Sequence, residues 1–179
     1  MLRVFAFDRI GVVLGDLYFV DPDPMPGQES PERGVRVEVR FVESQEHDGS
    51  IYAARPILIG EPIWRLDLLE SVDGTPGSFD RTHHHPLMRG YEPGSRKFEK
   101  ELSSDPLGYL AHRLRDLPGL LEQAELPSGR ATDEDLRQLD LSVEAIVAAT
   151  GEMLAQVRRA QLAHAAEPDS SGLARTGWL

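Results

Sequence analysis

The sequence predicts an α+β domain in which a twisted antiparallel sheet of about four or five strands packs against two C-terminal helices. Apolar and polar residues alternate in several segments of the first 80 residues, and a period of two is typical of half-buried strands. After residue 104, apolar residues recur at helical spacing instead. Strands that come before the helices, rather than between them, indicate the α+β class.

The length of 179 residues favours one domain. We expect it to span residues 1–166, with a strand-rich part (1–80), a loop region (71–103) and a helical part (104–166). Residues 167–179 are expected to form a tail that docks through the apolar side chains of Trp178 and Leu179. The tail could dock on the sheet of the same chain, on a second subunit or on another protein.

The strands are predicted from alternation and from the turn residues between them. The expected strands are Leu2–Phe7, Ile10–Val20, Val35–Val42, Ile51–Ile59 and Ile63–Leu69. Segments rich in proline, glycine or turn-forming polar residues separate most of them, at 21–34, 47–50 and 60–62. The clearest strand is 35–42, and its apolar side chains should face the helices: Val35, Val37, Val39 and Phe41.

The charged residues of the same strand should lie on the opposite face. A shift of one residue would bury Arg36, Glu38 and Arg40 and expose the apolar side chains, which would cost several kcal/mol. Together with Arg65 and Asp67 of a later strand, these residues are expected to form cross-strand ion pairs.

Two helices are predicted from their capping residues and apolar spacing. Asp105 followed by Pro106 is typical of a helix start, and this helix is expected to end near Pro118-Gly119. A second helix should begin after Thr132, with Asp135 in place of the usual glutamate of a capping box. Its apolar stripe consists of Leu136, Leu139, Val143, Ile146, Val147, Thr150, Leu154 and Val157.

The composition excludes several classes of protein. The absence of cysteine excludes disulfide frameworks, thiolate zinc sites, iron–sulfur clusters and cysteine nucleophiles. The net charge of −11 arises from acidic residues in both halves of the chain, and we therefore expect no binding of duplex DNA. No apolar run approaches the roughly 20 residues of a membrane span, so no membrane association is expected.

The N-terminus and the codon-sensitive residues indicate a cytoplasmic, bacterial protein. Met1 is not followed by the basic and apolar regions of a secretory signal. Arginine is far more frequent than lysine, and the chain contains no asparagine. Because lysine and asparagine have AT-rich codons, this composition is typical of a GC-rich bacterial genome.

The segment 78–91 contains three adjacent histidines. If it is extended, His83 and His85 project to one side and His84 to the other. Two imidazoles at this spacing can bind one divalent, zinc-like metal ion. Asp80 of the same segment is the candidate third ligand, and His47 or Asp67 could supply it instead; nothing in the sequence selects among them.

The same histidines could work without a metal. His83 and His85 would then act as a general acid and base, Asp80 would orient an imidazole, and Arg81 would hold an anion. Arg65, Arg89 and Tyr91 are further candidates for binding a substrate. We expect His84 to be dispensable for this chemistry. In a third interpretation the histidines serve only to cap turns or face water.

Two functions are compatible with these features. The first is an accessory or protein-interaction module, which would contact a partner or a second copy through the tail and the long helix. The alternative is a small hydrolase or ribonuclease-like enzyme centred on the His83/His85 segment, with or without a divalent metal. The enzyme requires that both histidines line a concave pocket together with a third ionisable group.

Overall fold

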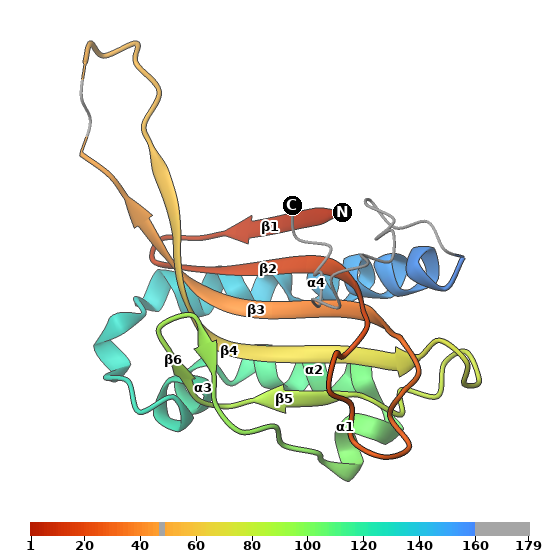
Figure 1. Cartoon of the computed structure of the whole chain (residues 1–179). Helices are drawn as coiled ribbons and strands as arrows, with labels where there is room; N and C mark the ends of the chain where they lie inside the picture. The colour runs from red at the N-terminus through yellow and green to blue at the C-terminus, as the bar shows by residue number, and fades with distance from the viewer. Residues whose placement is uncertain (47–48, 160–179) are drawn as a thin grey trace.

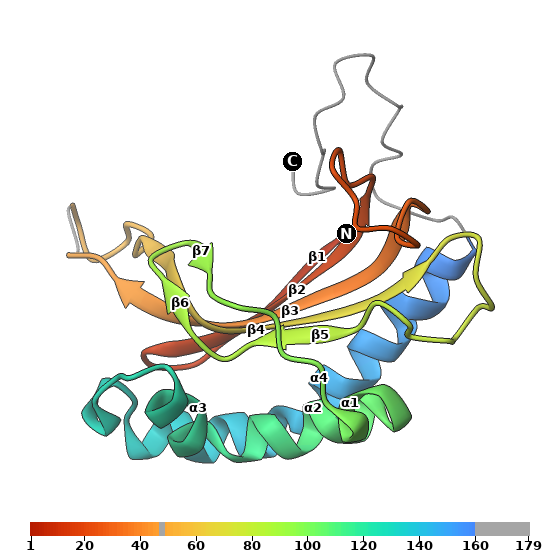
Figure 2. The same ribbon diagram turned by 60° about the horizontal axis from the view of Figure 1, so that its bottom comes forward.

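The structure, a computed structural model, describes residues 1–46 and 49–159. It confirms the predicted α+β class, with an N-terminal antiparallel sheet and C-terminal helices. Figures 1 and 2 show that the helices cover one face of the sheet, and Figure 2 shows β6 and β7 on the other side. None of the helices in these ranges is long and apolar enough to cross a membrane.

Within the described residues, five strands pair in the order β1-β2-β3-β4-β5, each antiparallel to its neighbour. They are β1 (Leu2–Ala6), β2 (Ile10–Phe19), β3 (Glu32–Ser44), β4 (Ile57–Ser71) and β5 (His83–His85), while β6 (Met88–Arg89) and β7 (Glu92–Pro93) pair separately. The helical part contains α1 (Lys100–Ser104), α2 (Pro106–Arg115), α3 (Leu117–Gln123), the 3-10 turn η1 (Ser128–Arg130) and α4 (Asp133–Arg158).

The core lies between the sheet and the helices, as the alternation in β3 predicts. Val35, Val37 and Val39 are fully buried, and they belong to one apolar cluster with Val143 and Ile146 of α4. The predicted stripe of α4 is buried except at its first member, Leu136, which is exposed, and at Val147, which is partly buried. The charged side chains of β3 lie on the other face of the sheet, away from the helices.

The prediction that residues 60–62 separate two strands is wrong. β4 runs without interruption from Ile57 to Ser71, and its pairing with β3 shifts register around Arg40, opposite Pro62. Such an irregularity tolerates a proline, which has no N–H to donate to the ladder. The strand predicted from residue 51 begins only at Ile57, because the residues before it extend beyond the body of the sheet (Figure 1).

The region 71–103, predicted to be a loop, contains β5, β6, β7 and most of α1. The segment Pro118-Gly119 likewise does not end the helical region. Instead α3 begins at Leu117, because Asp116 caps it by accepting a hydrogen bond from Gly119 and because a proline fits the first turn of a helix. Trp178 and Leu179, the predicted anchor of the tail, lie outside the described residues.

The start of α4 ties the helix to the sheet through a single buried carboxylate. Thr132 and Asp135 form the predicted capping box. The other oxygen of Asp135 accepts hydrogen bonds from three consecutive backbone N–H groups, those of residues 8–10, which connect β1 and β2. The short aspartate therefore caps the helix and closes the β1–β2 turn at the same time.

Candidate functional site

The three histidines form β5, the edge strand of the sheet. His83 lies opposite Asp67 of β4, and His85 lies opposite Arg65. Because side chains alternate along a strand, both rings point to the face away from the helices, whereas His84 points toward the core. The pairing of β5 with β4 thus brings Asp67 of β4 to the two imidazoles.

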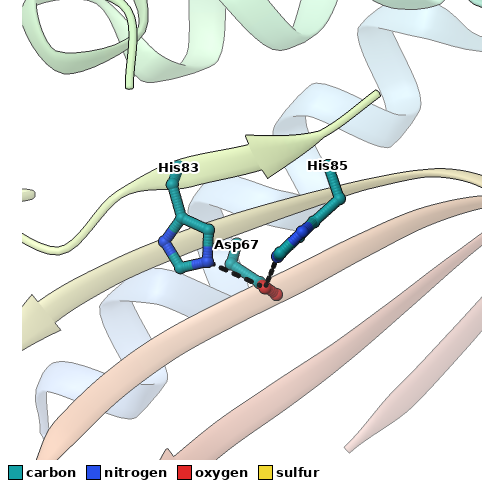
Figure 3. Close-up of side chains that lie close together, drawn as sticks. All are labelled: Asp67, His83 and His85. Carbon is teal, nitrogen blue, oxygen red and sulfur yellow. Dashed lines mark ion pairs between the residues drawn. The ribbon is translucent and has the colours of Figure 1, made fainter. Parts of the chain in front are cut away.

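Asp67, His83 and His85 converge on one point (Figure 3). The Nε2 atoms of His83 and His85 lie 3.5 Å and 3.7 Å from the Oδ2 atom of Asp67. The two rings meet edge to face, with their centroids 5.0 Å apart. All three side chains are buried.

Backbone carbonyls fix the orientation of both rings. The Nδ1 atom of His83 lies 2.8 Å from the carbonyl oxygen of Arg81, and that of His85 lies 2.7 Å from the carbonyl oxygen of Gly94. A carbonyl oxygen can only accept, so each Nδ1 carries the proton. When a ring is neutral, its Nε2 presents a lone pair to the Asp67 carboxylate. Three acceptor atoms facing one another favour a bound cation.

The charge of Asp67 is maintained in this buried position. Arg36 donates from Nε to Oδ1 at 2.6 Å and from Nη2 to Oδ2 at 3.3 Å. Burial acts to raise the pKa of Asp67, but the interactions with His85 and Arg36 outweigh it and hold the pKa far below its usual range. Burial also lowers the pKa of His83, and the Asp67 carboxylate opposes this only in part. An ionised carboxylate thus faces a neutral His83 near pH 7.

The spacing of the three atoms fits a tetrahedral metal ion. Zinc binds histidine nitrogen and carboxylate oxygen at about 2.0–2.2 Å, which places neighbouring ligand atoms of a tetrahedron about 3.3–3.6 Å apart. The two separations from Asp67 are close to this range, and all three ligand atoms lie within 4.8 Å of one another. Histidines held through Nδ1 by backbone carbonyls are also the usual arrangement around protein-bound zinc.

The three residues border a pocket of about 380 Å³ on the face of the sheet that carries the charged side chains. Its lining includes three arginines, two of them from the sheet and one from the segment after β7. The lining residues are Phe19, Arg36, Arg65, Asp67, Leu69, His83, His85, Pro93, Gly94, Ser95 and Arg96. An ion bound by the three ligands would therefore be accessible to a small molecule.

His84 has a structural role on the opposite side of β5. Its Nδ1 accepts a hydrogen bond from Trp64 at 3.1 Å, and its Nε2 lies 2.9 Å from a carboxylate oxygen of Glu99. Burial lowers the pKa of His84, against the opposing influence of Glu99. The prediction that His84 is dispensable can therefore apply to the chemistry alone, because the fold uses this side chain.

The predicted third ligand Asp80 is not placed at the imidazoles. Asp80 accepts hydrogen bonds from the backbone and hydroxyl of Ser71 and from the hydroxyl of Ser78, so the turn after β4 uses its carboxylate. Asp67 takes the position expected for Asp80 in the group of potential ligands. His47 lies outside the described residues.

The arginines and the tyrosine named from the sequence divide between the pocket and its surroundings. Arg65 lines the pocket and is paired with Glu38. The side chain of Arg81 donates to the carbonyl of Gly27, and only its own carbonyl contributes to the site. Arg89 and Tyr91 are exposed and do not belong to the pocket lining.

Sequence reasoning missed two contributors to the pocket, Arg36 and Arg96. Arg36 was expected in a cross-strand ion pair, which it forms with Asp67, but the alternation gave no sign that this pair borders a pocket. Comparisons of the chain with protein-family models, with curated proteins and with solved structures find no match. Function is therefore inferred from the geometry of this site.

Proposed function

We propose that the chain is a small metal-dependent hydrolase whose centre is a divalent ion bound by Asp67, His83 and His85. One observation carries this proposal: two imidazole Nε2 atoms, each oriented by a carbonyl on Nδ1, converge with a carboxylate at the wall of a pocket. The pocket and the third ionisable group beside the histidines also support an enzyme over histidines that only cap a turn.

The three residues leave room for the chemistry of a catalytic zinc site. Three protein ligands and an open fourth position are typical of such sites, and zinc lowers the pKa of a bound water to about 7. Arg36, which donates to both carboxylate oxygens, would hold Asp67 in its ligating orientation. The pocket would admit the substrate next to the fourth position.

A metal-free acid–base pair has less support from the same geometry. Each Nδ1 is engaged by a carbonyl, so both rings can exchange protons only at Nε2, and both Nε2 atoms face the same carboxylate. An acid and a base acting on opposite sides of a substrate need two separate directions of approach. The arrangement suits a shared cation better.

A second candidate, a protein-interaction module, is favoured by the arm that connects β3 and β4. Figure 1 shows this arm projecting from the body of the molecule, and its side chains Ile51 and Tyr52 are 87 % and 90 % exposed. The long helix offers less apolar surface, because most of its apolar stripe is buried and Leu136 and Leu141 are its exposed large apolar side chains. If the arm mediates self-association, light scattering of the purified chain will show a dimer that the variant Tyr52→Ser loses.

Metal analysis of the purified chain, without an affinity tag, tests the metal-dependent hydrolase. We expect one zinc ion per chain in the wild type and in His112→Gln, a control histidine exposed on α2. His83→Gln and His85→Gln should weaken zinc binding by more than about 100-fold, since removing even an outer partner of a ligand costs about 10–100-fold. Equal zinc binding in all four proteins would overturn the proposal.

Activity screening separates the two enzymatic versions. A hydrolytic activity that is lost with a chelator and in both ligand variants supports the metal centre. An activity that survives the chelator but still requires His83 and His85 would replace it with the acid–base pair. His112→Gln should match the wild type in either case.

A further inference from the structure

The pocket beside the candidate metal site carries an excess of positive charge. Arg36 is paired with Asp67, and Arg65 shares the single carboxylate of Glu38 with Arg40. Each of these two guanidinium groups contacts a different oxygen of Glu38, so two positive charges share one negative charge on the same face of the sheet. This concentration of arginine occurs in a chain whose net charge is −11, so it is a local property of the pocket.

Arg96 adds a further positive charge, and among residues 1–46 and 49–159 it acts on the buried carboxylate of Glu32, where it opposes the rise in pKa that burial causes. It lies on the segment after β7, lines the pocket and is exposed, and no hydrogen bond or ion pair joins it to those residues. Arg65 uses its Nε on Glu38, and neither of its Nη atoms is hydrogen-bonded to the described part of the chain. Guanidinium groups that line a pocket and still have N–H donors without an acceptor can bind the oxygens of an anion.

We propose that the pocket binds the phosphoryl group of a small phosphate ester, with Arg96 and Arg65 on its terminal oxygens. This inference rests on the proposed function, in which a metal ion at Asp67, His83 and His85 would take another oxygen of the same group. A phosphoryl group has enough terminal oxygens for a metal ion and two guanidinium groups, whereas a carboxylate has only two oxygens.

The size of the pocket and the charge of the chain restrict the substrate further. A volume of about 380 Å³ lies near the lower end of the range of about 300–1,000 Å³ for small-molecule sites. The overall negative charge opposes the approach of a long phosphate backbone. The pocket therefore fits a small phosphate ester better than a nucleic acid.

The same charges predict that the metal and the anion bind with positive coupling. A divalent ion adds to the positive charge of the arginines, and this repulsion weakens its binding in the absence of an anion. A phosphoryl group removes the repulsion. Coupling of this kind is reciprocal, so phosphate should also bind more tightly when the metal is present.

Calorimetric titration with inorganic phosphate tests the assignment. The full chain is loaded with one equivalent of zinc, freed of excess ion, and compared with chelator-treated protein and with the variants Arg96→Gln and Arg89→Gln. Arg89 is a matched control, because it is exposed on β6 and does not line the pocket. Acetate, titrated under the same conditions, distinguishes a carboxylate ligand from a phosphoryl one.

We expect phosphate to bind zinc-loaded wild type and Arg89→Gln equally, and Arg96→Gln about tenfold more weakly or worse, because it loses a charge-assisted contact. Arg96→Gln should keep one zinc ion per chain, which separates this result from a failure of the metal site. Chelator-treated protein should bind phosphate at least tenfold more weakly, as roughly expected for coupled sites.

Two results would overturn the inference. Equal phosphate affinity in Arg96→Gln and Arg89→Gln would exclude Arg96 as an anion ligand, and acetate binding as tight as phosphate binding would replace the phosphoryl group with a carboxylate. If zinc does not bind the wild type, the proposed function fails. The phosphate affinities of Arg96→Gln and Arg89→Gln are then compared without metal, and equal affinities would again exclude Arg96 as an anion ligand.

Discussion

Replacing His84 with alanine should destabilise the protein while leaving the candidate metal ligands in place. His84 is 2 % exposed and lies between the two candidate ligands His83 and His85, but its ring points to the other side of the sheet. The indole N–H of Trp64 can only donate, so Nδ1 of His84 accepts and Nε2 carries the proton that faces Glu99. The ring therefore links Trp64 in the core to Glu99, the residue that precedes α1.

The cost of the substitution follows from these contacts. Leaving the buried N–H of Trp64 without an acceptor costs about 1–3 kcal/mol. Deleting a buried ring adds a cavity penalty, and large-to-small core substitutions together cost about 2–5 kcal/mol. The side chain of Glu99 is 43 % exposed, so losing its hydrogen bond adds less than about 1 kcal/mol. We expect a loss of about 3 kcal/mol, or about 6–12 °C in Tm for a chain of this size.

Urea denaturation followed by circular dichroism measures this loss. His84→Gln keeps one acceptor and one donor and should recover at least half of the stability. In a double-mutant cycle, Trp64→Phe should reduce the penalty of His84→Ala, because the unsatisfied N–H is then absent. A loss below about 0.5 kcal/mol, typical of surface positions, would refute the role of His84. If folded His84→Ala loses zinc while His83→Gln keeps it, the metal ion binds on the face of β5 that carries His84, not on the face that carries His83 and His85.

Three further outcomes are expected. Asp135→Asn should lose about 2–4 kcal/mol in urea denaturation, because its amide cannot accept all the hydrogen bonds of the carboxylate; an unchanged midpoint would contradict this. Zinc at about 100 times its Kd should stabilise the wild type by about 2.7 kcal/mol, or roughly 5–10 °C in a thermal shift assay, and His85→Gln should show no shift. Gly34→Ala should cost about 1–3 kcal/mol or more, because its Cβ would lie 1.9 Å from a backbone carbonyl of β4. Gly129→Ala, with open space around its Cβ, should match the wild type.

Much of the fold could be predicted because single elements carry their own signals. The alternation at Val35, Val37 and Val39 fixed which face of β3 is buried, and the residues Thr132 and Asp135 located the start of α4. The errors arose where pairing with a neighbouring strand overrode the usual local preference of a residue. Pro62 looked like the end of a strand, but the register shift opposite it allows β4 to continue.

The candidate site could be predicted only in the part that one strand encodes. Alternation along the strand placed His83 and His85 on one side, and this inference did not depend on knowing the neighbouring strand. The third ligand depends on which residue of β4 lies opposite them, and no pattern in the sequence specifies that register. Asp80 was the nearest carboxylate in the chain, yet Ser71 and Ser78 already use it.

Contacts on both sides of β5 set its register with β4. The site therefore depends on the fold, because this register brings Asp67 to the two histidines. The hydroxyl of Thr82 both donates to the carbonyl of Leu69 and accepts from its N–H, each at 3.0 Å, and His84 exchanges backbone hydrogen bonds with Lys97 on the other side. A shift by one residue would turn the rings of His83 and His85 toward the helices. A shift by two residues toward the start of β4 would place Arg65, a cation, opposite His83. In the observed register Asp67 lies opposite His83. The ring of His83, which the carbonyl of Arg81 orients, therefore faces a carboxylate, as the proposed metal site requires.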